Sequence, residues 1–321
     1  MRILVTGANG MLGRALVAQL MHDPRYVVRA AVRYVSDALP AGVDVVEIGD
    51  MTAHPDWSKA LQEVDVVVHV AARAHVMSDT ATSPLQEYRR VNTAATIELA
   101  QKAAESGVQR FLFVSSIKVN GEATELGAPF ISDAPAMPQD AYGVSKMEGE
   151  QGVQQVAHAT GMAYVVVRPP LIYGPGVKAN FEVMMRWLDM GIPLPLATIH
   201  NKRSLVALDN LVDMLVTCIE HPSAANQTFL VSDGEDLSTP ELLRRLSAAM
   251  GRSARLFPMP EAVLRFSAML LDRSDMAQRL CGSLQVDISK TCQQLGWHPT
   301  ITVDEGLRRT AAAWRFAQRQ A

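Results

Sequence analysis

The stretch Ile3-Leu-Val-Thr-Gly7-Ala-Asn-Gly10-Met-Leu-Gly13 sets the expected fold, because an apolar run enters a glycine-rich turn and continues as a helix-like segment. Glycines at this spacing have separate uses. The first permits a tight turn, the second lets the backbone approach a pyrophosphate, and the third lets the helix pack closely on the strand. Amides at the start of the helix then face the phosphates. We therefore expect a dinucleotide here, contacted by Gly7, Gly10, Met11, Leu12 and Gly13.

Short apolar runs rich in β-branched residues alternate with helix-like segments through the first two-thirds of the chain. The expected strands cover residues 3–6, 27–32, 64–71, 110–115 and 164–168, and the expected helices cover residues 12–21, 57–63, 94–106 and 142–160. Nearly continuous apolarity is typical of strands that are buried on both faces. The alternation therefore predicts an α/β fold with a doubly wound parallel sheet of the Rossmann type.

Proline and glycine interrupt the chain after Arg168, which predicts a smaller, loop-rich C-terminal lobe suited to binding a substrate. A helix near 210–220 and a strand near 228–231 would return to the sheet. We expect a dinucleotide-binding domain over 1–170, joined again by 205–235, and a substrate lobe over 171–204 and 236–321. Ser238 and Glu241 have the spacing of a capping box, so a helix is expected to begin there.

Composition argues against several classes of protein. The formal net charge is −3 and Lys and Arg form no block, so no nucleic acid partner is expected. The three cysteines, Cys218, Cys281 and Cys292, lie far apart without a CxxC spacing, which predicts reduced thiols and no metal site. We see neither an export signal nor an apolar run of membrane-spanning length. A cytoplasmic protein without membrane attachment is expected.

Two positions bear on the choice of dinucleotide. The second expected strand ends in Ala30-Ala-Val-Arg33, where an acidic residue would accept hydrogen bonds from both ribose hydroxyls. Arg33 could pair with a 2′-phosphate instead, which favours NADP over NAD, although a solvated arginine would give the same sequence. Asp50 and Met51 follow a third strand. Asp50 is placed to accept from an adenine amino group, to cap the following helix, or to do both.

Tyr142 and Lys146 stand four residues apart in an expected helix, so their side chains share one face, one turn apart. A phenol with a pKa near ~10 is a poor base at neutral pH, and a fixed ammonium beside it stabilises the phenolate and lowers this pKa. The expected strand 110–115 leads into Ser115 and Ser116. Strand ends carry side chains to the carboxyl edge of a parallel sheet, where ligands bind. We therefore predict that proton transfer takes place at this edge.

The chain carries a set of short motifs in a fixed order. These are Gly7-xx-Gly10-xx-Gly13, Asp50, Ala71-Ala72, Asn92, Ser115-Ser116 and Tyr142/Lys146, followed by Arg168-Pro-Pro-Leu-Ile-Tyr-Gly-Pro, Arg203-Ser-Leu-Val-Ala-Leu-Asp-Asn-Leu-Val-Asp, and Asp287-Ile-Ser-Lys with Leu295-Gly-Trp. In order and spacing they resemble the extended short-chain dehydrogenase/reductases, and more narrowly the nucleotide-sugar epimerase/dehydratase group. The resemblance covers nearly the whole chain. It implies an oxidoreductase that uses NAD or NADP.

The resemblance also implies a role for each matching residue. Ser116 would hydrogen-bond the reacting carbonyl or hydroxyl, with Ser115 as its non-catalytic neighbour. Tyr142 would be the acid/base, and Lys146 would lower its pKa and bind the nicotinamide ribose. Asn92 would help to hold the active-site backbone, or would simply cap a helix. The residues expected along the cofactor are Ala71, Ala72, Asn92, Pro169 and Ile172.

In the substrate lobe, the resemblance implies contacts with the diphosphate of a UDP-sugar. Asn180 and Phe181 match a pair that meets this diphosphate. Arg203 matches an arginine that pairs with it, and a guanidinium suits the task because it forms two parallel bonds to phosphate oxygens. Arg279 lies where a second phosphate arginine often occurs, although a surface arginine fits equally. Leu171 stands where many members have asparagine, so one polar contact is expected to be missing.

The reaction type is inferred from the neighbours of these residues. Ile117-Lys118 follow Ser116 where dehydratases of the group have an Asp-Glu pair, which argues against dehydration. The sequence most resembles 4-reductases of UDP-4-keto-6-deoxy-N-acetylhexosamines in surface-polysaccharide synthesis, and the missing acid near Arg33 favours this interpretation. The alternative is a 4-epimerase of UDP-hexoses (GlcNAc or Glc) with tightly held NAD.

Two other classes of function are less favoured. Intact Ser116, Tyr142 and Lys146 argue against a non-catalytic, cofactor-binding regulator. Arg203 argues against a steroid-like substrate, because an apolar ligand leaves a buried guanidinium unpaired. The expected helices 94–106 and 142–160 commonly form a dimer interface in this group, so a homodimer is expected.

Overall fold

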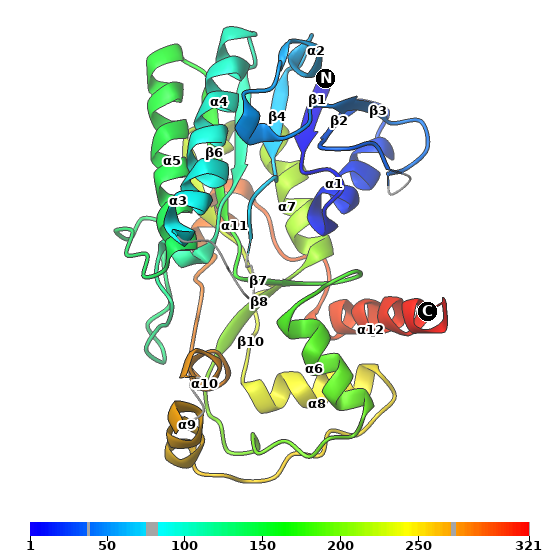
Figure 1. Ribbon diagram of the computed structural model, residues 1–321, viewed down its shortest axis with the longest axis vertical. Helices are drawn as coiled ribbons and strands as arrows, with labels where there is room; N and C mark the ends of the chain where they lie inside the picture. Colours follow the sequence, from blue (N-terminus) through cyan, green and yellow to red (C-terminus); the bar gives the residue numbers. More distant parts are fainter. Residues whose placement is uncertain (37–38, 75–82, 271–273, 321) are drawn as a thin grey trace.

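The computed structural model describes residues 1–36, 39–74, 83–270 and 274–320, and it shows a sheet domain joined to a smaller second lobe (Figure 1). A seven-stranded parallel sheet forms the centre, with the strand order β3-β2-β1-β4-β5-β6-β9. The strands are β1 (Arg2–Thr6), β2 (Val27–Val32), β3 (Asp44–Glu47), β4 (Val66–His69), β5 (Arg110–Val114), β6 (Ala163–Arg168) and β9 (Gln227–Leu230). The predicted doubly wound α/β fold is confirmed.

Helices cover both faces of this sheet (Figure 1). They are α1 (Met11–Met21) and α7 (Leu208–Glu220) on one face, and α2 (Ser58–Leu61), α4 (Ala95–Glu105) and α5 (Ala141–Thr160) on the other. Successive side chains of a strand point to opposite faces. In β1, Val5 therefore joins the core under α1, and Leu4 joins the core under α4.

The second lobe has its own core around a three-stranded sheet with the order β10-β8-β7. Its elements are β7 (Leu171–Tyr173), β8 (Arg203–Ala207), β10 (Asp236–Leu237), α6 (Asn180–Asp189), α8 (Thr239–Ala249), α9 (Glu261–Leu270), α10 (Ser274–Cys281) and α12 (Val303–Gln320), while α11 (Ser289–Leu295) packs near β9. The predicted capping box begins α8. Ser238 Oγ accepts from the amide of Glu241, and the Glu241 carboxylate accepts from the amide of Ser238.

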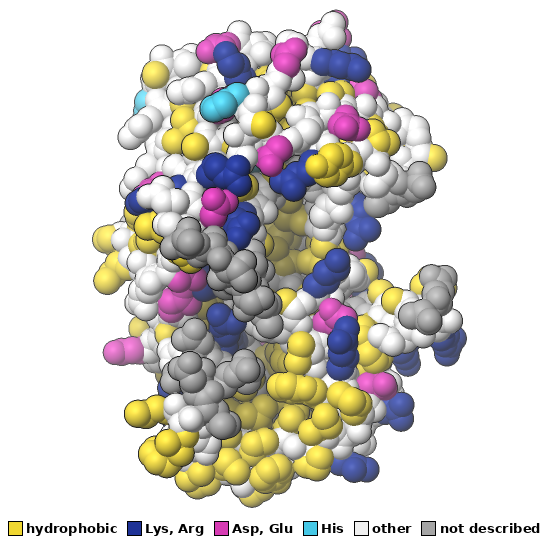
Figure 2. Space-filling model, in the orientation of Figure 1, with side chains coloured by type: hydrophobic (Ala, Val, Ile, Leu, Met, Phe, Trp, Pro, Cys, Tyr) yellow, Lys and Arg dark blue, Asp and Glu magenta, His cyan; other side chains and the backbone are white. Residues whose placement is uncertain are grey.

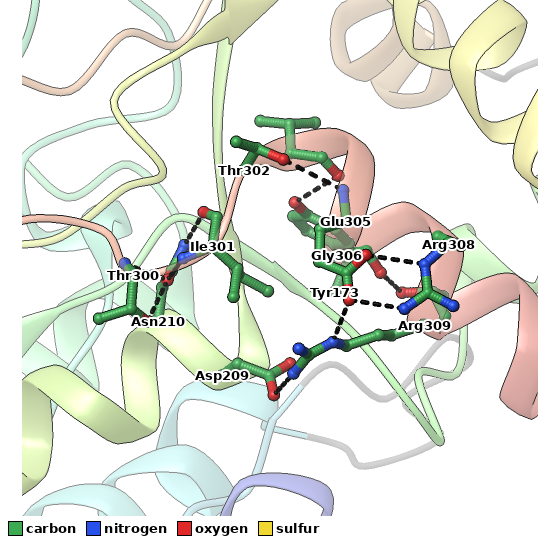
Figure 3. A network of polar contacts seen from close by, with 12 residues as sticks. Tyr173, Asp209, Asn210, Thr300, Ile301, Thr302, Glu305, Gly306, Arg308 and Arg309 are labelled. Carbon is green, nitrogen blue, oxygen red and sulfur yellow. Dashed lines mark hydrogen bonds and ion pairs between the residues drawn. The ribbon is translucent and has the colours of Figure 1, made fainter.

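Asn210, near the start of α7, ties the C-terminal segment to the rest of the chain (Figure 3). Its Oδ1 accepts from the amides of Thr300 at 2.8 Å and Ile301 at 3.0 Å. Its Nδ2 donates to Asp233 Oδ1 at 2.7 Å. Beside it, Arg309 of α12 donates to Asp209 at 2.6 Å. These contacts fix the start of α12 against α7.

Several elements differ from the prediction. The expected helix 94–106 follows α3 (Pro84–Tyr88) and a π-helix (Arg89–Ala94), and shorter 3₁₀ turns are η1 (Met51–Ala53), η3 (Ile117–Val119) and η4 (Pro222–Ala224). The expected strand 64–71 is shorter, as β4.

All three cysteines are free thiols, with Cys218 and Cys281 buried and Cys292 half-buried. Within the described part of the chain, no helix is long and apolar enough to cross a membrane, and no group of acidic, His and Cys side chains could hold a metal ion.

Candidate active site

The glycine turn lies between β1 and α1, at the carboxyl edge of the sheet. Gly7 has a φ of +67°, and a Cβ there would lie 2.7 Å from the amide nitrogen of Ala71. A Cβ on Gly13 would lie 2.2 Å from the carbonyl oxygen of Gly7, so the helix packs directly on the turn. Gly10 is exposed at the N-cap of α1, where no side chain caps the helix. The first amides of α1 can therefore face an anion.

The two residues after Gly10 differ in exposure. Leu12 is buried in the core under α1, so only its backbone can meet a ligand at the turn. Met11 is half-buried and lines a cavity of about 810 Å³ between α1, α7 and Pro175. Tyr142 does not line this cavity. The cavity is thus separate from the predicted site of proton transfer.

Asp50 and Arg33 meet beside the glycine turn. Asp50 Oδ1 accepts from the amide and the hydroxyl of Thr52, each at 2.9 Å, and so caps η1. These hydrogen bonds lower the pKa of Asp50. Arg33 Nη2 lies 3.9 Å from the same carboxylate oxygen. Of the uses predicted for Asp50, capping is the one present, and Arg33 has a carboxylate neighbour. Met51, the first residue of η1, is half-buried.

His69, at the end of β4, is a buried residue that sequence reasoning missed. Its Nδ1 is hydrogen-bonded to Thr6 Oγ1 at 2.7 Å, and its Nε2 to Thr96 Oγ1 at 3.0 Å. Its ring stacks on Phe113 with a centroid separation of 5.6 Å. Burial, and to a lesser extent the charge of Lys146, lowers the pKa of His69 to about 3. A neutral imidazole therefore links β1, β4 and α4 beneath the site.

Tyr142 and Ser116 are brought together by the start of α5 and the end of β5. The Ser116 hydroxyl is near enough to affect the Tyr142 phenol by hydrogen bonding, and the ring of Tyr88 meets the Tyr142 ring edge-on at 5.9 Å between centroids. Burial raises the pKa of Tyr142 to about 12, the hydrogen bond from Ser116 opposes this shift, and Asp140 and Tyr88 add to it. At neutral pH the phenol is therefore protonated.

Lys146 is fully buried one turn further along α5. Its Nζ donates to the carbonyl oxygen of Val114 at 2.7 Å and lies 3.9 Å from the ring centroid of Phe113. Burial lowers the pKa of Lys146 to about 7, partly opposed by Glu150. The prediction of a lowered pKa for Tyr142 is therefore wrong for this structure. Burial penalises the phenolate, and the ammonium beside it is itself partly deprotonated at neutral pH.

A buried ion pair lies behind the two serines. Arg168, at the end of β6, donates from Nε and Nη2 to the two carboxylate oxygens of Glu150, at 2.9 Å and 2.6 Å. Glu150 also accepts from the hydroxyl of Ser115, and Arg168 donates to Asn120 Oδ1 at 3.0 Å. Sequence reasoning missed Glu150, although it stands four residues after Lys146 on the same helix face. The network fixes the end of β5 against α5.

Asn92 is buried in the π-helix and does not cap a helix, so the capping interpretation is wrong. Its Oδ1 accepts from the amide of Arg73 at 2.8 Å, and its Nδ2 donates to Ser145 Oγ at 3.0 Å. Asn92 thereby joins the segment after β4 to the helix that carries Tyr142.

Most of the other residues predicted along the cofactor lie where parallel strands of the large sheet end. Ala71 is half-buried and Ala72 exposed, just after β4. Pro169 is buried after β6, and its carbonyl oxygen accepts from the amide of Ile117 at 3.0 Å. Ile172 is half-buried in β7. Ala71, Ala72 and Pro169 share the carboxyl edge with the glycine turn, because neighbouring parallel strands end on the same side, whereas Ile172 belongs to the sheet of the second lobe.

Arg203 lies in β8 and Arg279 in α10, both in the second lobe. Arg203 Nη1 donates to the carbonyl oxygen of Gly282 at 2.9 Å. Burial and the charge of Arg279 lower the pKa of Arg203, whereas the charge of Glu122 raises it. Of the two arginines predicted to meet a diphosphate, Arg203 is thus affected by the charge of Arg279. Figure 2 shows the surface hollowed between the sheet domain and this lobe, with Lys and Arg side chains at the margin.

Asn180 and Phe181 begin α6 but differ in environment. Asn180 is exposed and open to a ligand. Phe181 is fully buried and stacks on Tyr173, with 5.6 Å between ring centroids. The ring of Phe181 belongs to the core of the lobe, so the contact predicted for this residue with the diphosphate would have to come from its backbone. Leu171, where many members of the group have asparagine, is 41% exposed.

A doubly wound sheet with a glycine turn, and with a serine, a tyrosine and a lysine at its carboxyl edge, defines a nicotinamide-dependent enzyme of the short-chain dehydrogenase/reductase class. The model of the NAD dependent epimerase/dehydratase family matches residues 3–232. The chain belongs to this family.

The chain is also similar to individual known proteins, in sequence and in structure. The chain is 48% identical over 316 residues to a UDP-glucose 4-epimerase of Vibrio cholerae, which covers 97% of this chain and 95% of that protein. Among solved structures it resembles a UDP-glucuronic acid 4-epimerase from Bacillus cereus in complex with NAD, with a TM-score of 0.79, 20% identity and 99% of each chain covered. It also resembles a UDP-glucose 4-epimerase with UDP-glucose from Thermotoga maritima, with a TM-score of 0.78, 22% identity, and 99% of this chain and 100% of that chain covered. These two structural likenesses show the fold.

Proposed function

We propose that this chain is a UDP-sugar 4-epimerase, which inverts C4 of a UDP-hexose (GlcNAc or Glc) with tightly held NAD. The observation that carries the proposal is the 48% identity, over 97% of the chain, to a protein named UDP-glucose 4-epimerase. The reductase that the sequence favoured becomes the second candidate.

The residues at the glycine turn fit a dinucleotide. Neither Gly7 nor Gly13 has room for a side chain, and the exposed Gly10 leaves the start of α1 open to a pyrophosphate. Bound NAD would accept a hydride from C4 of the sugar and return it to the opposite face. We place Asp50 and Met51 near the adenosine, and Pro169 and Ile172 near the nicotinamide.

At C4, Tyr142 would take the hydroxyl proton and later return it, while Ser116 holds the C4 oxygen by a hydrogen bond. The pKa of Tyr142 is about 12, so the phenol is well suited to donate its proton to a C4 ketone. Removal of a proton from the C4 hydroxyl needs the phenolate, which the charged form of Lys146 would stabilise. Tyr142, Ser116 and Lys146 would therefore serve both the oxidation of the C4 hydroxyl and the reduction of the C4 ketone.

The second lobe would hold the diphosphate of the substrate. The charge of Arg279 acts on Arg203, and a diphosphate between the two guanidinium groups would relieve this repulsion. Asn180 is exposed at the start of α6 and would add a hydrogen bond. We propose these three as the diphosphate contacts.

One observation favours the second candidate, a 4-reductase of UDP-4-keto-6-deoxy-N-acetylhexosamines. No acidic residue ends β2, and Arg33 stands there with 58% of its side chain exposed. A guanidinium in this place would tolerate the 2′-phosphate of NADPH, which a reductase must bind and release. Its ion pair with Asp50 is exposed and would yield to a phosphate at little cost.

Incubation with UDP-GlcNAc or UDP-glucose, without added cofactor, tests the first candidate. We expect conversion to the galacto sugar, followed by NMR of the anomeric protons. Oxidation of NADPH or NADH with a UDP-4-keto-6-deoxy-N-acetylhexosamine, and no epimer from either UDP-hexose, would replace the epimerase by the reductase. Tyr142→Phe is the control, since it should abolish either reaction and leave cofactor binding nearly unchanged.

We further propose a cytoplasmic homodimer that forms through α4 and α5. These helices pack side by side on one face of the sheet. Sedimentation equilibrium would give twice the mass of one chain, and a monomer at micromolar concentration would contradict the dimer.

A further inference from the structure

Lys118 lies two residues after Ser116, in the turn η3, and is held between two carboxylates. Its Nζ lies 2.5 Å from Asp140 Oδ2 and 2.9 Å from Glu122 Oε1. Only 16% of its side chain is exposed, against 34% for Asp140 and 29% for Glu122. Its backbone amide donates to Ser116 Oγ at 3.3 Å. An ammonium ion is thus fixed beside the proposed site of proton transfer.

Asp140 is the N-cap of α5 and stands two residues before Tyr142. Its Oδ1 accepts from the amide of Gly143 at 2.6 Å, and its other oxygen meets Lys118. The two contacts fix the carboxylate on the helix start that carries the phenol. A carboxylate there stabilises the helix, because it receives a free amide and complements the helix dipole. The same negative charge opposes formation of a phenolate nearby.

Charged and titratable groups approach Tyr142 from several elements. Asp140 caps α5, Lys146 lies within α5, and Tyr88 belongs to α3. Arg73, after β4, has its guanidinium 5.5 Å from the centroid of the Tyr88 ring. Ser116 and Lys118 come from the segment after β5. Among these groups, Asp140 raises the pKa of Tyr142, and Lys118 is the cation that contacts Asp140 directly.

We propose that Lys118 is a positioning residue that holds and offsets the Asp140 carboxylate, so that α5 keeps its charged cap while Tyr142 meets a pair of nearly zero net charge. The inference rests on the proposed proton-transfer role of Tyr142. Glu122 competes for the same ammonium and lies on the side of Arg203, whose pKa it raises. Lys118 therefore separates two carboxylates, one at the start of the catalytic helix and one toward the predicted diphosphate contacts.

The ionisation of Tyr142 can be measured without any substrate. A difluorinated tyrosine at position 142 ionises at lower pH than tyrosine, and fluorine NMR follows its titration in the folded protein. Lys118→Met should move the titration midpoint to higher pH by roughly half a unit or more, as expected for loss of a nearby opposite charge. Asp140→Asn keeps a capping oxygen and should move the midpoint to lower pH. Lys118→Arg should leave it within a few tenths of a unit.

The double variant Lys118→Met/Asp140→Asn is the decisive comparison. Removal of both charges should return the midpoint close to that of the parent, since the two effects have opposite sign. Glu122→Gln is the matched control, because it also removes a carboxylate bonded to Lys118 and should shift the midpoint less than Asp140→Asn. A midpoint unmoved by Lys118→Met, or moved equally by loss of Glu122 and loss of Asp140, would overturn the proposal.

The pH profile of epimerisation separates this inference from the proposed function. If Lys118→Met shifts both the midpoint and the profile in the same direction, both proposals are supported. A shifted midpoint in a protein that converts no UDP-sugar supports the role of Lys118 and refutes the epimerase. Full conversion of a UDP-sugar with an unmoved titration midpoint supports the epimerase and refutes the role of Lys118.

Discussion

Burial disfavours the charged form of Lys146. The resulting loss in the free energy of unfolding depends on pH. The lysine titrates near pH 7 in the folded chain and near ~10.4 when unfolded, so unfolding takes up a proton between these values. The burial penalty is fully present below about pH 7 and fades as the pH rises. Lys146→Met removes it at every pH. We expect the stability of the parent relative to this variant to rise by about 1.4 kcal/mol per pH unit above neutrality.

Urea unfolding of both proteins between pH 6 and pH 9 would measure this difference, because all other titrating groups are shared. A stability difference that stays constant across the range would mean that Lys146 keeps its charge when buried.

Gly13 and Gly10 should respond differently to alanine. A Cβ on Gly13 would lie 2.2 Å from the Gly7 carbonyl oxygen, whereas one on Gly10 would lie 3.2 Å from it. Gly13→Ala must displace α1 from the turn, and we expect a loss of about 2 kcal/mol or more in the free energy of unfolding. Gly10→Ala should cost less than about 1 kcal/mol but still weaken NAD binding. Unfolding curves and calorimetric titration with NAD would show the two patterns, and equal destabilisation would contradict them.

Single residues were predictable where a motif fixes their geometry. The glycines and the neighbouring positions of Ser116 and Tyr142 follow from chain order, because strand and helix ends must meet at one edge of the sheet. The pKa of Tyr142 was predicted with the wrong sign, since it depends on burial, which spacing does not reveal. The burial of the Phe181 ring was not predicted for a similar reason. Its neighbour Tyr173 comes from another element, and a sequence does not show which aromatic rings stack.

Within α5, Glu150 and Glu148 make ion pairs in different environments. The Glu150–Arg168 pair is buried, with side-chain exposures of 3% and 9%. The Glu148–Arg89 pair is 25% and 39% exposed. Glu150→Gln leaves Arg168 poorly paired, and we expect a loss of about 3 kcal/mol. Glu148→Gln should cost less than about 1 kcal/mol. Thermal unfolding would compare them, and similar losses would show that burial does not decide the cost.

Elements were predictable where their apolar pattern is continuous. The central strands β1, β4, β5 and β6 are buried on both faces and read clearly as apolar runs. The edge strand β3 has only one buried residue, Val46, so its pattern is weak and no range was predicted for it. The π-helix before α4 has no periodicity of its own, because one wider turn does not change the sequence pattern of the flanking helices.

Across the whole molecule, Asn210 joins the C-terminal segment to α7. Asn210→Ala would leave the amides of Thr300 and Ile301 without their acceptor, and we expect a loss of about 2 kcal/mol or more. Amide hydrogen exchange should speed up most in α12. Arg309→Gln breaks the partly exposed ion pairs with Asp209 and Glu305 and serves as the control, with little change expected. Uniform acceleration throughout the chain would contradict a local role for Asn210.

The three cysteines differ in how readily a thiol reagent can reach them. Burial raises the pKa of each, so none is a ready thiolate at neutral pH. Cys218 is fully buried and Cys281 nearly so, whereas Cys292 is half-buried in α11. A maleimide dye applied briefly to the native protein would therefore mark α11 first, and Cys218 only after unfolding. The order in which the three cysteines react with the dye would show which parts of the chain become accessible first during unfolding.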